Sequence, residues 1–135
     1  MSFDIFLQCF RNQELAGFDR AVFDEIFGPY IVERDETFVR LCYPDRGCAD
    51  IYVRDTPTID SMMINHFGGE MFFEGLYELA QRTGSLIHWP SEEDASVVTD
   101  RETWTHIPTV FTNEDAHPTL ASNWRQMVDA IERSN

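Results

Sequence analysis

Residues 2–10, SFDIFLQCF, limit the fold most strongly, because they alternate in side-chain direction and are apolar on both sides. In an extended chain, positions 3, 5, 7 and 9 share one side and are all apolar, while the other side carries two more phenylalanines. A strand whose two sides both need cover lies inside a sheet. The chain is therefore expected to build a sheet with this segment near its centre.

Three amphipathic segments predict helices that could cover such a sheet. The first follows Asp19, a capping residue type, and stops at Gly28-Pro29. The second runs over residues 70–83, between Gly68-Gly69 and Gly84. The third closes the chain and repeats its apolar residues at helical spacing. Its expected stripe is Leu120, Trp124, Met127, Val128 and Ile131.

The remaining segments read mainly as strands. Residues 38–43 and 48–55 flank the turn-forming PDRG and predict a hairpin, and residues 58–67 and 85–90 predict further strands. Residues 91–115 predict loop with short edge strands. The order of elements favours an α+β fold with a mainly antiparallel β-sheet and helices packed on one face. A chain of 135 residues fits a single domain, spanning residues 1–135.

The charge of the chain restricts its partners. It carries 24 acidic and 10 basic residues, a formal net charge of −14. Surfaces that bind phosphate are basic, so direct binding to nucleic acid or to an anionic membrane is not expected. The same charge favours capture of a basic partner. The alternative is that the charge serves solubility alone.

Acidic residues are densest between residues 91 and 115, where one arginine and Trp104 accompany them. An acidic surface around an aromatic anchor suits a binder of a basic protein, although a solvated loop would look the same. A second acidic group lies at an expected hairpin tip. The candidate partner-binding residues are Glu92, Glu93, Asp94, Asp100, Glu102, Trp104, Glu33, Asp35 and Glu36.

No motif predicts catalysis or a cofactor. HFGGE, residues 66–70, lacks the lysine and the spaced glycines of a phosphate-binding loop, so we interpret it as a strand-to-helix turn. The chain lacks G-x-S-x-G and HExxH. A zinc site would need His88 and His106 to converge with Cys42 or Cys48, and the C-x5-C spacing does not favour it. We expect no catalytic residue, no metal and no cofactor.

The three cysteines, Cys9, Cys42 and Cys48, are an odd number, which argues against a secreted disulfide scaffold. Residues 1–13 also lack the pattern of a signal peptide. We therefore expect a cytoplasmic protein with reduced thiols. Pairing of Cys42 with Cys48 across the expected hairpin remains the alternative.

Taken together, the acidic composition, the single domain and the lack of a catalytic motif resemble the immunity proteins of polymorphic toxin and contact-dependent systems. The segments MSFDIFLQCFRN and GSLIHWPSEEDASVVTD are also similar to small bacterial α+β proteins of uncharacterised function. The first resemblance implies a cognate toxin, often a basic nuclease, neutralised by occlusion of its active site. The other hypotheses are a small-ligand-binding domain or enzyme with a site between sheet and helices, and a regulatory or structural subunit.

Overall fold

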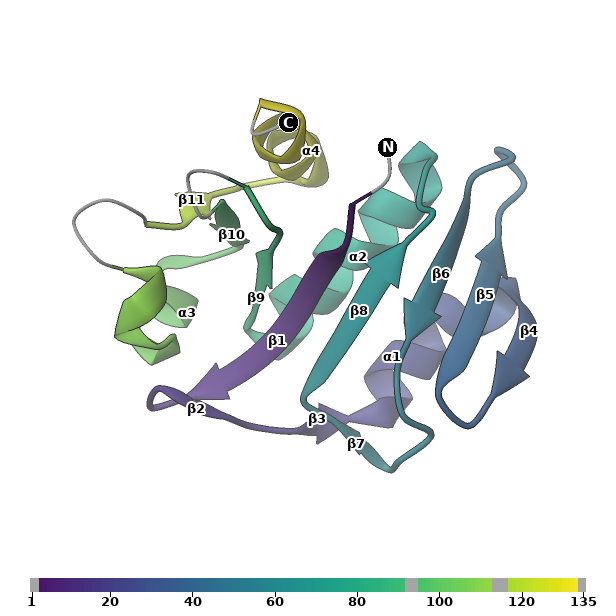
Figure 1. Cartoon of the computed structure of the whole chain (residues 1–135), viewed down its shortest axis with the longest axis horizontal. Helices are drawn as coiled ribbons and strands as arrows, with labels where there is room; N and C mark the ends of the chain where they lie inside the picture. The colour runs from purple at the N-terminus through teal and green to yellow at the C-terminus, as the bar shows by residue number, and fades with distance from the viewer. Residues whose placement is uncertain (1–2, 92–94, 113–116, 134–135) are drawn as a thin grey trace.

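A mixed, mostly antiparallel sheet forms the centre of the molecule in a computed structural model that describes residues 3–91, 95–112 and 117–133 (Figure 1). The sheet has nine strands in the order β11-β10-β9-β1-β8-β6-β5-β4, with β2 paired to β1 outside this path. Only β10 and β11 pair in parallel among the described strands. The strands are β1 (Ile5–Arg11), β2 (Glu14–Leu15), β4 (Ile31–Asp35), β5 (Phe38–Cys42), β6 (Cys48–Tyr52), β8 (Ser61–Asn65), β9 (Ser85–His88), β10 (Ser96–Val98) and β11 (Thr119–Leu120).

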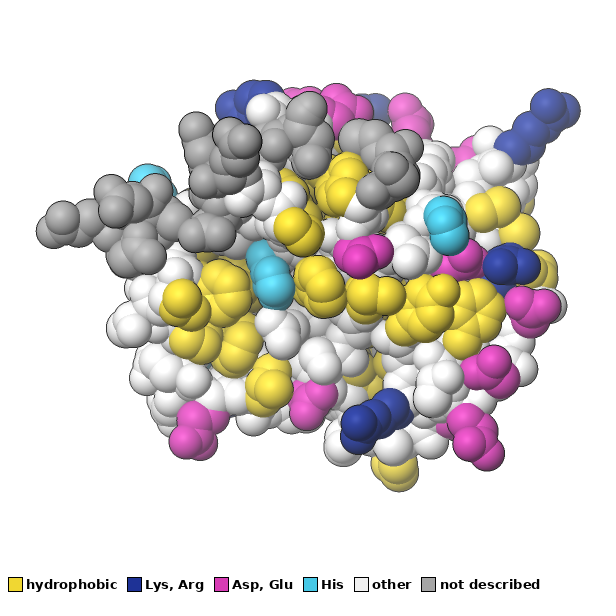
Figure 2. All heavy atoms as spheres, in the orientation of Figure 1, with side chains coloured by type: hydrophobic (Ala, Val, Ile, Leu, Met, Phe, Trp, Pro, Cys, Tyr) yellow, Lys and Arg dark blue, Asp and Glu magenta, His cyan; other side chains and the backbone are white. Residues whose placement is uncertain are grey.

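The predicted α+β fold is confirmed, and β1 lies between β9 and β8 in the interior of the sheet as its two apolar sides require. Helices α1 (Arg20–Phe27), α2 (Glu70–Thr83) and α4 (Trp124–Arg133) pack on one face of the sheet. Figure 2, drawn in the orientation of Figure 1, shows the opposite face, which we call the open face. A separate two-stranded sheet pairs β3 (Phe18–Asp19) with β7 (Thr58–Ile59).

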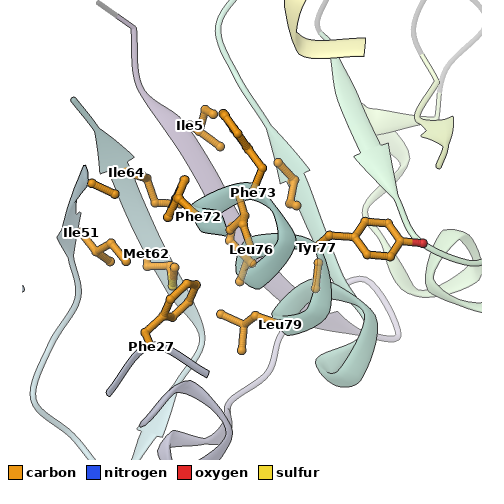
Figure 3. Packing of buried hydrophobic residues seen from close by; sticks show 14 of the residues in the cluster. Ile5, Phe27, Ile51, Met62, Ile64, Phe72, Phe73, Leu76, Tyr77 and Leu79 are labelled. Carbon is orange, nitrogen blue, oxygen red and sulfur yellow. The ribbon is translucent and has the colours of Figure 1, made fainter. Parts of the chain in front are cut away.

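The core lies between the sheet and α1 and α2, and Figure 3 shows its packing. Alternate residues of each strand point into it, as Ile5 of β1, Ile51 of β6 and Ile64 of β8 do. Helix α2 supplies Phe72 and Leu76, which have no exposed surface. This layer is filled by close-packed apolar side chains.

Local sequence signals account for the ends of the helices. The carboxylate of Asp19 accepts a hydrogen bond from the Ala21 N–H at 2.9 Å and caps α1, as predicted. Helix α2 ends at Gly84, whose φ of +64° lies in the left-handed region that favours glycine. Both boundaries agree with the expectation from the sequence.

Two expectations were wrong. Leu120 does not belong to the apolar stripe of the last helix, because it lies in β11 and the helix begins only at Trp124. The side chain of Asn123 accepts from the Gln126 N–H at 3.0 Å, which starts the helix there. The segment around Trp104, expected as loop or edge strand, forms helix α3 (Arg101–His106), capped by Asp100 through the Thr103 N–H at 2.8 Å. Short 3₁₀ turns occupy Gly28–Tyr30 and Thr109–Phe111.

Helix α3 covers one end of the open face. A second apolar cluster gathers there, and its strand residues alternate with those of the main core. This cluster contains Phe10, Leu86, Val98 and Ile107, with Trp104 and Phe111 packed against it. Among the described residues, the open face is therefore covered at the β9–β10 end and not over β8, β6 and β5.

The glycine pair before α2 is a strand-to-helix turn, as the sequence predicts. Gly69 has a φ of +89° and precedes the first helical residue. Gly69 packs against Gly47 of the β5–β6 turn. A Cβ added at Gly69 would lie 2.7 Å from the Gly47 Cα. Asp45 of that turn accepts hydrogen bonds from the Met71 N–H at 3.0 Å and the Gly47 N–H at 2.8 Å. A carboxylate of the chain itself thus occupies the position that a bound phosphate would take.

Removing this carboxylate is expected to lower the melting temperature in a pH-dependent way. Hydrogen bonds from the N–H groups of Met71 and Gly47 lower the pKa of Asp45. A lowered pKa stabilises the fold above the unfolded value of about 3.9, and this contribution is lost as the pH falls through the folded value. In thermal unfolding followed by circular dichroism, Asp45→Ala should differ most from the native protein at pH 7 and least near pH 3. Asp45→Asn, which keeps an acceptor but no charge, should show the same pH trend with a smaller loss at every pH, because the trend comes from titration of the native carboxylate.

Candidate functional site

A line of apolar side chains crosses the open face from strand to strand (Figure 2). Register places its members opposite one another in β5, β6, β8, β1 and β9. We call this line the apolar row: it consists of Phe38, Tyr52, Met63, Phe6 and His88. All five are accessible, and Tyr52 is the most exposed, at 41%. Contiguous exposed apolar surface of this kind marks interaction sites.

Ring contacts hold the apolar row in place. The rings of Phe38 and Tyr52 lie 5.2 Å apart, and Phe6 stacks on His88 at 5.2 Å. Because these ring contacts already restrict the side chains, less conformational entropy is lost when a partner binds. The Nε2 atom of His88 also lies 2.7 Å from Oε1 of Gln8. Burial lowers the pKa of His88, so its ring is neutral at pH 7 and the row carries no charge.

A polar ladder runs beside the apolar row on the same face. We use this name for Asp4, Asn65, Asp50, Arg40 and Glu33, which neighbour one another across the strands. Asn65 Nδ2 donates to Asp4 at 3.3 Å, and Arg40 lies 2.8 Å from Asp50 and 3.5 Å from Glu33. The ladder carries three carboxylates and one guanidinium, so its formal charge is negative.

Asp50 is the buried member of the polar ladder, with 6% of its surface exposed. Its second oxygen lies 2.9 Å from Nδ1 of His66, whose side chain is 73% exposed. Burial opposes ionisation of Asp50, but hydrogen bonds from Arg40 and His66 outweigh it and lower the pKa. Asp50 is thus an ionised carboxylate that fixes an arginine and a histidine at the surface.

An open groove lies on the other side of the apolar row. Its volume is about 770 Å³, and the segment between β6 and β8 forms one wall. Phe6, Tyr52 and Met63 of the row reach its lining, together with Arg54 and Asp60. The lining contains no histidine or cysteine among the described residues. The Ser61 hydroxyl donates to the carboxylate of its chain neighbour Asp60 at 3.1 Å. The groove therefore enlarges the contact surface and, among the described residues, pairs no nucleophile with a histidine base.

Part of the predicted binding set lies at one end of the apolar row. Glu33 and Asp35 are in β4, and only Glu36 lies in the turn into β5. Asp35 stands opposite Phe38 in the register, and its carboxylate accepts from the Thr37 N–H at 2.9 Å. The acidic hairpin tip expected from the sequence is thus joined to an aromatic residue of the open face.

The other predicted residues lie around α3, near the opposite end of the row. Asp100 caps the helix, Glu102 is exposed in its first turn, and Trp104 is half-buried against the second cluster with its ring 6.0 Å from His117. Glu92, Glu93 and Asp94 lie outside the described residues. Six strand spacings separate β10 from β4, roughly 29 Å. The predicted residues therefore form two groups, and the apolar row runs between them.

Sequence reasoning did not find the apolar row, although its residues were visible. Phe6 and Phe38 stand out as apolar residues on the less apolar side of their strands. Only the register shows that they fall into one line with Tyr52 and Met63.

No family model, curated protein or solved structure matches the chain.

The candidate metal ligands from the sequence do not converge. His88 in β9 and the cysteines in β5 and β6 are separated by β1 and β8, and His106 accepts from the Asn12 N–H at 3.2 Å. Across the described ranges, no group of three or more histidine, cysteine, aspartate or glutamate side chains is placed to hold a metal ion. In the same ranges, no helix combines the length and the apolar character needed to span a membrane.

Proposed function

We propose that this protein binds a basic protein through the open face of its sheet, and that it acts as an immunity protein that neutralises a cognate toxin in the cytoplasm by covering its active site. The observation that carries the proposal is the apolar row. Protein-binding surfaces combine an aromatic centre with a polar rim. The row supplies such a centre, and the polar ladder and the two acidic groups supply such a rim.

The charge of the chain favours a basic partner over a second copy. All ten basic residues are arginines, and several are already paired with carboxylates: Arg20 with Asp24, Arg40 with Asp50, and Arg82 with Glu25. The carboxylates outnumber the arginines, so the unpaired ones are left to attract other molecules. Two copies at −14 each would repel on approach, whereas a basic surface would be attracted.

The negative charge also disfavours a single-stranded nucleic acid, which aromatic rows on sheets can bind by stacking. Such binding also needs a basic groove along the phosphates. Here the ladder beside the row carries three carboxylates.

The acids at the two ends of the row would act before contact. Glu36 lies at the β4 end and Glu102 at the α3 end, and both are exposed. Rim charges raise the association rate by attracting the partner over about 8 Å at physiological salt, while buried anchors slow dissociation. In this arrangement the row supplies the anchors, and Trp104 supports the end of the face through the second cluster.

The alternative of a small-ligand-binding domain is supported by the groove beside the row. It does not lie between sheet and helices, where the core fills the space, but on the open face. A ligand there would contact Phe6, Tyr52 and Met63, the residues also proposed to contact a protein. The two hypotheses therefore require a direct binding test.

The proposal is tested by co-expression with the product of the adjacent gene, followed by pull-down and a growth-protection assay. A complex and protection are expected. Because the chain contains no lysine, a carbodiimide that joins carboxylates to amines should link its acids to lysines of the partner and not to side chains of a second copy. Crosslinks should map to the open face. No complex and no protection would overturn the proposal and leave the ligand-binding hypothesis first.

Reversing the rim charges is expected to slow association. The double variant Glu36→Lys and Glu102→Lys removes one acid at each end of the row. Its association rate should fall about tenfold at low salt, and the salt dependence should weaken, because electrostatic attraction acts on the encounter. The matched control is Glu74→Lys with Glu132→Lys, which changes the net charge equally on exposed positions of the helical face. Equal effects of both variants in stopped-flow measurements would show that the open face is not used.

A further inference from the structure

Cys42 and Cys48 face each other across the β5–β6 hairpin on the open face. Their Sγ atoms are 3.2 Å apart, and both thiols are free. The Tyr43 N–H donates to the Gly47 carbonyl oxygen at 2.9 Å, so the next pair outward, Cys42 with Cys48, falls at a non-hydrogen-bonded position. At such positions the Cα atoms are about 4.5 Å apart, inside the range that a disulfide spans.

The two cysteines differ from the third in accessibility. Cys42 is exposed and Cys48 is partly exposed, whereas Cys9 is buried and its Sγ lies 3.5 Å from the Thr83 carbonyl oxygen. The turn between the pair is held by Asp45, whose carboxylate binds both Gly47 and the start of α2. The backbone therefore keeps the two sulfurs opposed, and a movement of about 1 Å would bring them to bonding distance near 2.05 Å.

We propose that Cys42 and Cys48 form a dithiol site that closes reversibly to a disulfide by exchange with a low-molecular-weight disulfide such as oxidised glutathione. The site is independent of the partner-binding function, because it needs only the hairpin geometry and access to solvent.

Cys42, the more exposed thiol, reacts first. Its thiolate attacks one sulfur of glutathione disulfide, which forms a mixed disulfide and releases one glutathione thiolate. The Cys48 thiolate then attacks the Cys42 sulfur, which forms the Cys42–Cys48 bond and releases the second glutathione. The two protein thiols lose two electrons and two protons, and the products are one protein disulfide and two glutathione thiols.

Hydrogen bonding to Cys42 and burial raise the pKa of Cys48, so in the native hairpin this residue is the weaker nucleophile toward an external disulfide. The mixed disulfide at Cys42 removes that hydrogen bond. It also places the Cys48 sulfur beside its target, which favours closure over a second adduct.

The test is thiol counting by alkylation and mass spectrometry after incubation of the folded protein with oxidised glutathione at pH 8. The native chain should lose two of its three alkylatable thiols, carry no glutathione and regain both thiols with dithiothreitol. Cys9 should remain alkylatable after denaturation, as an internal control. Cys48→Ser should instead retain one glutathione at Cys42.

Three alkylatable thiols in the oxidised native chain would overturn the proposal, as would stable glutathione adducts on both cysteines. Closure should also fail in 6 M guanidinium chloride at the same oxidant concentration. The unfolded chain no longer holds the two sulfurs opposite each other, so glutathione adducts on the cysteines should compete with the internal disulfide. If closure is equally complete there, the short spacing of the two cysteines in the chain and not the hairpin would be responsible, and the proposed site would be wrong.

Discussion

Gly69→Ala is expected to lower the free energy of unfolding by about 3 kcal/mol, while Gly68→Ala, one residue earlier, should change it by less than about 1 kcal/mol. Gly69 has a φ of +89° and a ψ of 145°, a region that residues with a Cβ rarely adopt. The added Cβ would also lie 2.7 Å from the Gly47 Cα and 3.0 Å from Asp45 Oδ1. Strain and overpacking each cost about 1–3 kcal/mol. At Gly68, the added Cβ would meet no heavy atom of the described residues within 4 Å beyond its own chain neighbours.

Equilibrium unfolding in urea measures both variants and tests whether Gly69 joins the sheet to α2. If it does, only Gly69→Ala is costly, because Gly68 has neither the positive φ nor the close contact. If the contact with Gly47 is loose, neither substitution changes the free energy of unfolding much. Equal midpoints for the two variants would show that the contact between the Gly69 and Gly47 turns does not hold the fold together.

Local signals in the sequence account for the parts of the fold that were predicted. Asp19, Gly84 and the PDRG turn each act within a few residues of their own position. The strand β1 is apolar on both sides because other parts of the protein pack against both faces of the sheet there. Helix α3 was missed although it also has a local signal, since Asp100 precedes Thr103 at capping distance. Five of the six residues in RETWTH are polar or charged, so the segment shows no apolar helical pattern.

Long-range pairing accounts for most of what was missed. Leu120 fits the apolar spacing of α4, yet it pairs in parallel with Val98 of β10, a contact that no local pattern indicates. The apolar row depends on the register between five strands. Shifting one strand by a single residue would turn its member toward the core, so a list of residues cannot establish the row.

The candidate binding residues show the same limit. Composition reveals where acids are dense, and it correctly marked Glu36 and Glu102 as exposed. It could not show that Asp100 is used to cap a helix or that Trp104 packs on a second cluster. The aromatic centre of the face lies in strands that the charge pattern does not mark.

Tyr52→Ala is expected to weaken partner binding by about 30-fold, which corresponds to roughly 2 kcal/mol. Tyr52 is the most exposed member of the apolar row, with Met63 and Phe38 on either side in the register. Tyrosine is enriched among residues that dominate protein interfaces, because it buries a large ring at a small entropic cost. The loss should be in the dissociation rate, since truncation of an anchor leaves the electrostatic attraction unchanged.

The matched control is Leu15→Ala, which removes an apolar side chain of 51% exposure from β2, outside the row. It should bind as the native chain does, and both variants should keep the native melting temperature within a few degrees, because neither side chain is buried.

Trp104→Ala, measured by surface plasmon resonance, distinguishes a binding centre at the apolar row from an anchor at Trp104 of α3. If the row is the centre, Tyr52→Ala speeds dissociation more than Trp104→Ala does at equal stability. The reverse order would place the anchor at α3, where the acidic sequence first suggested it, and would assign the row to another role.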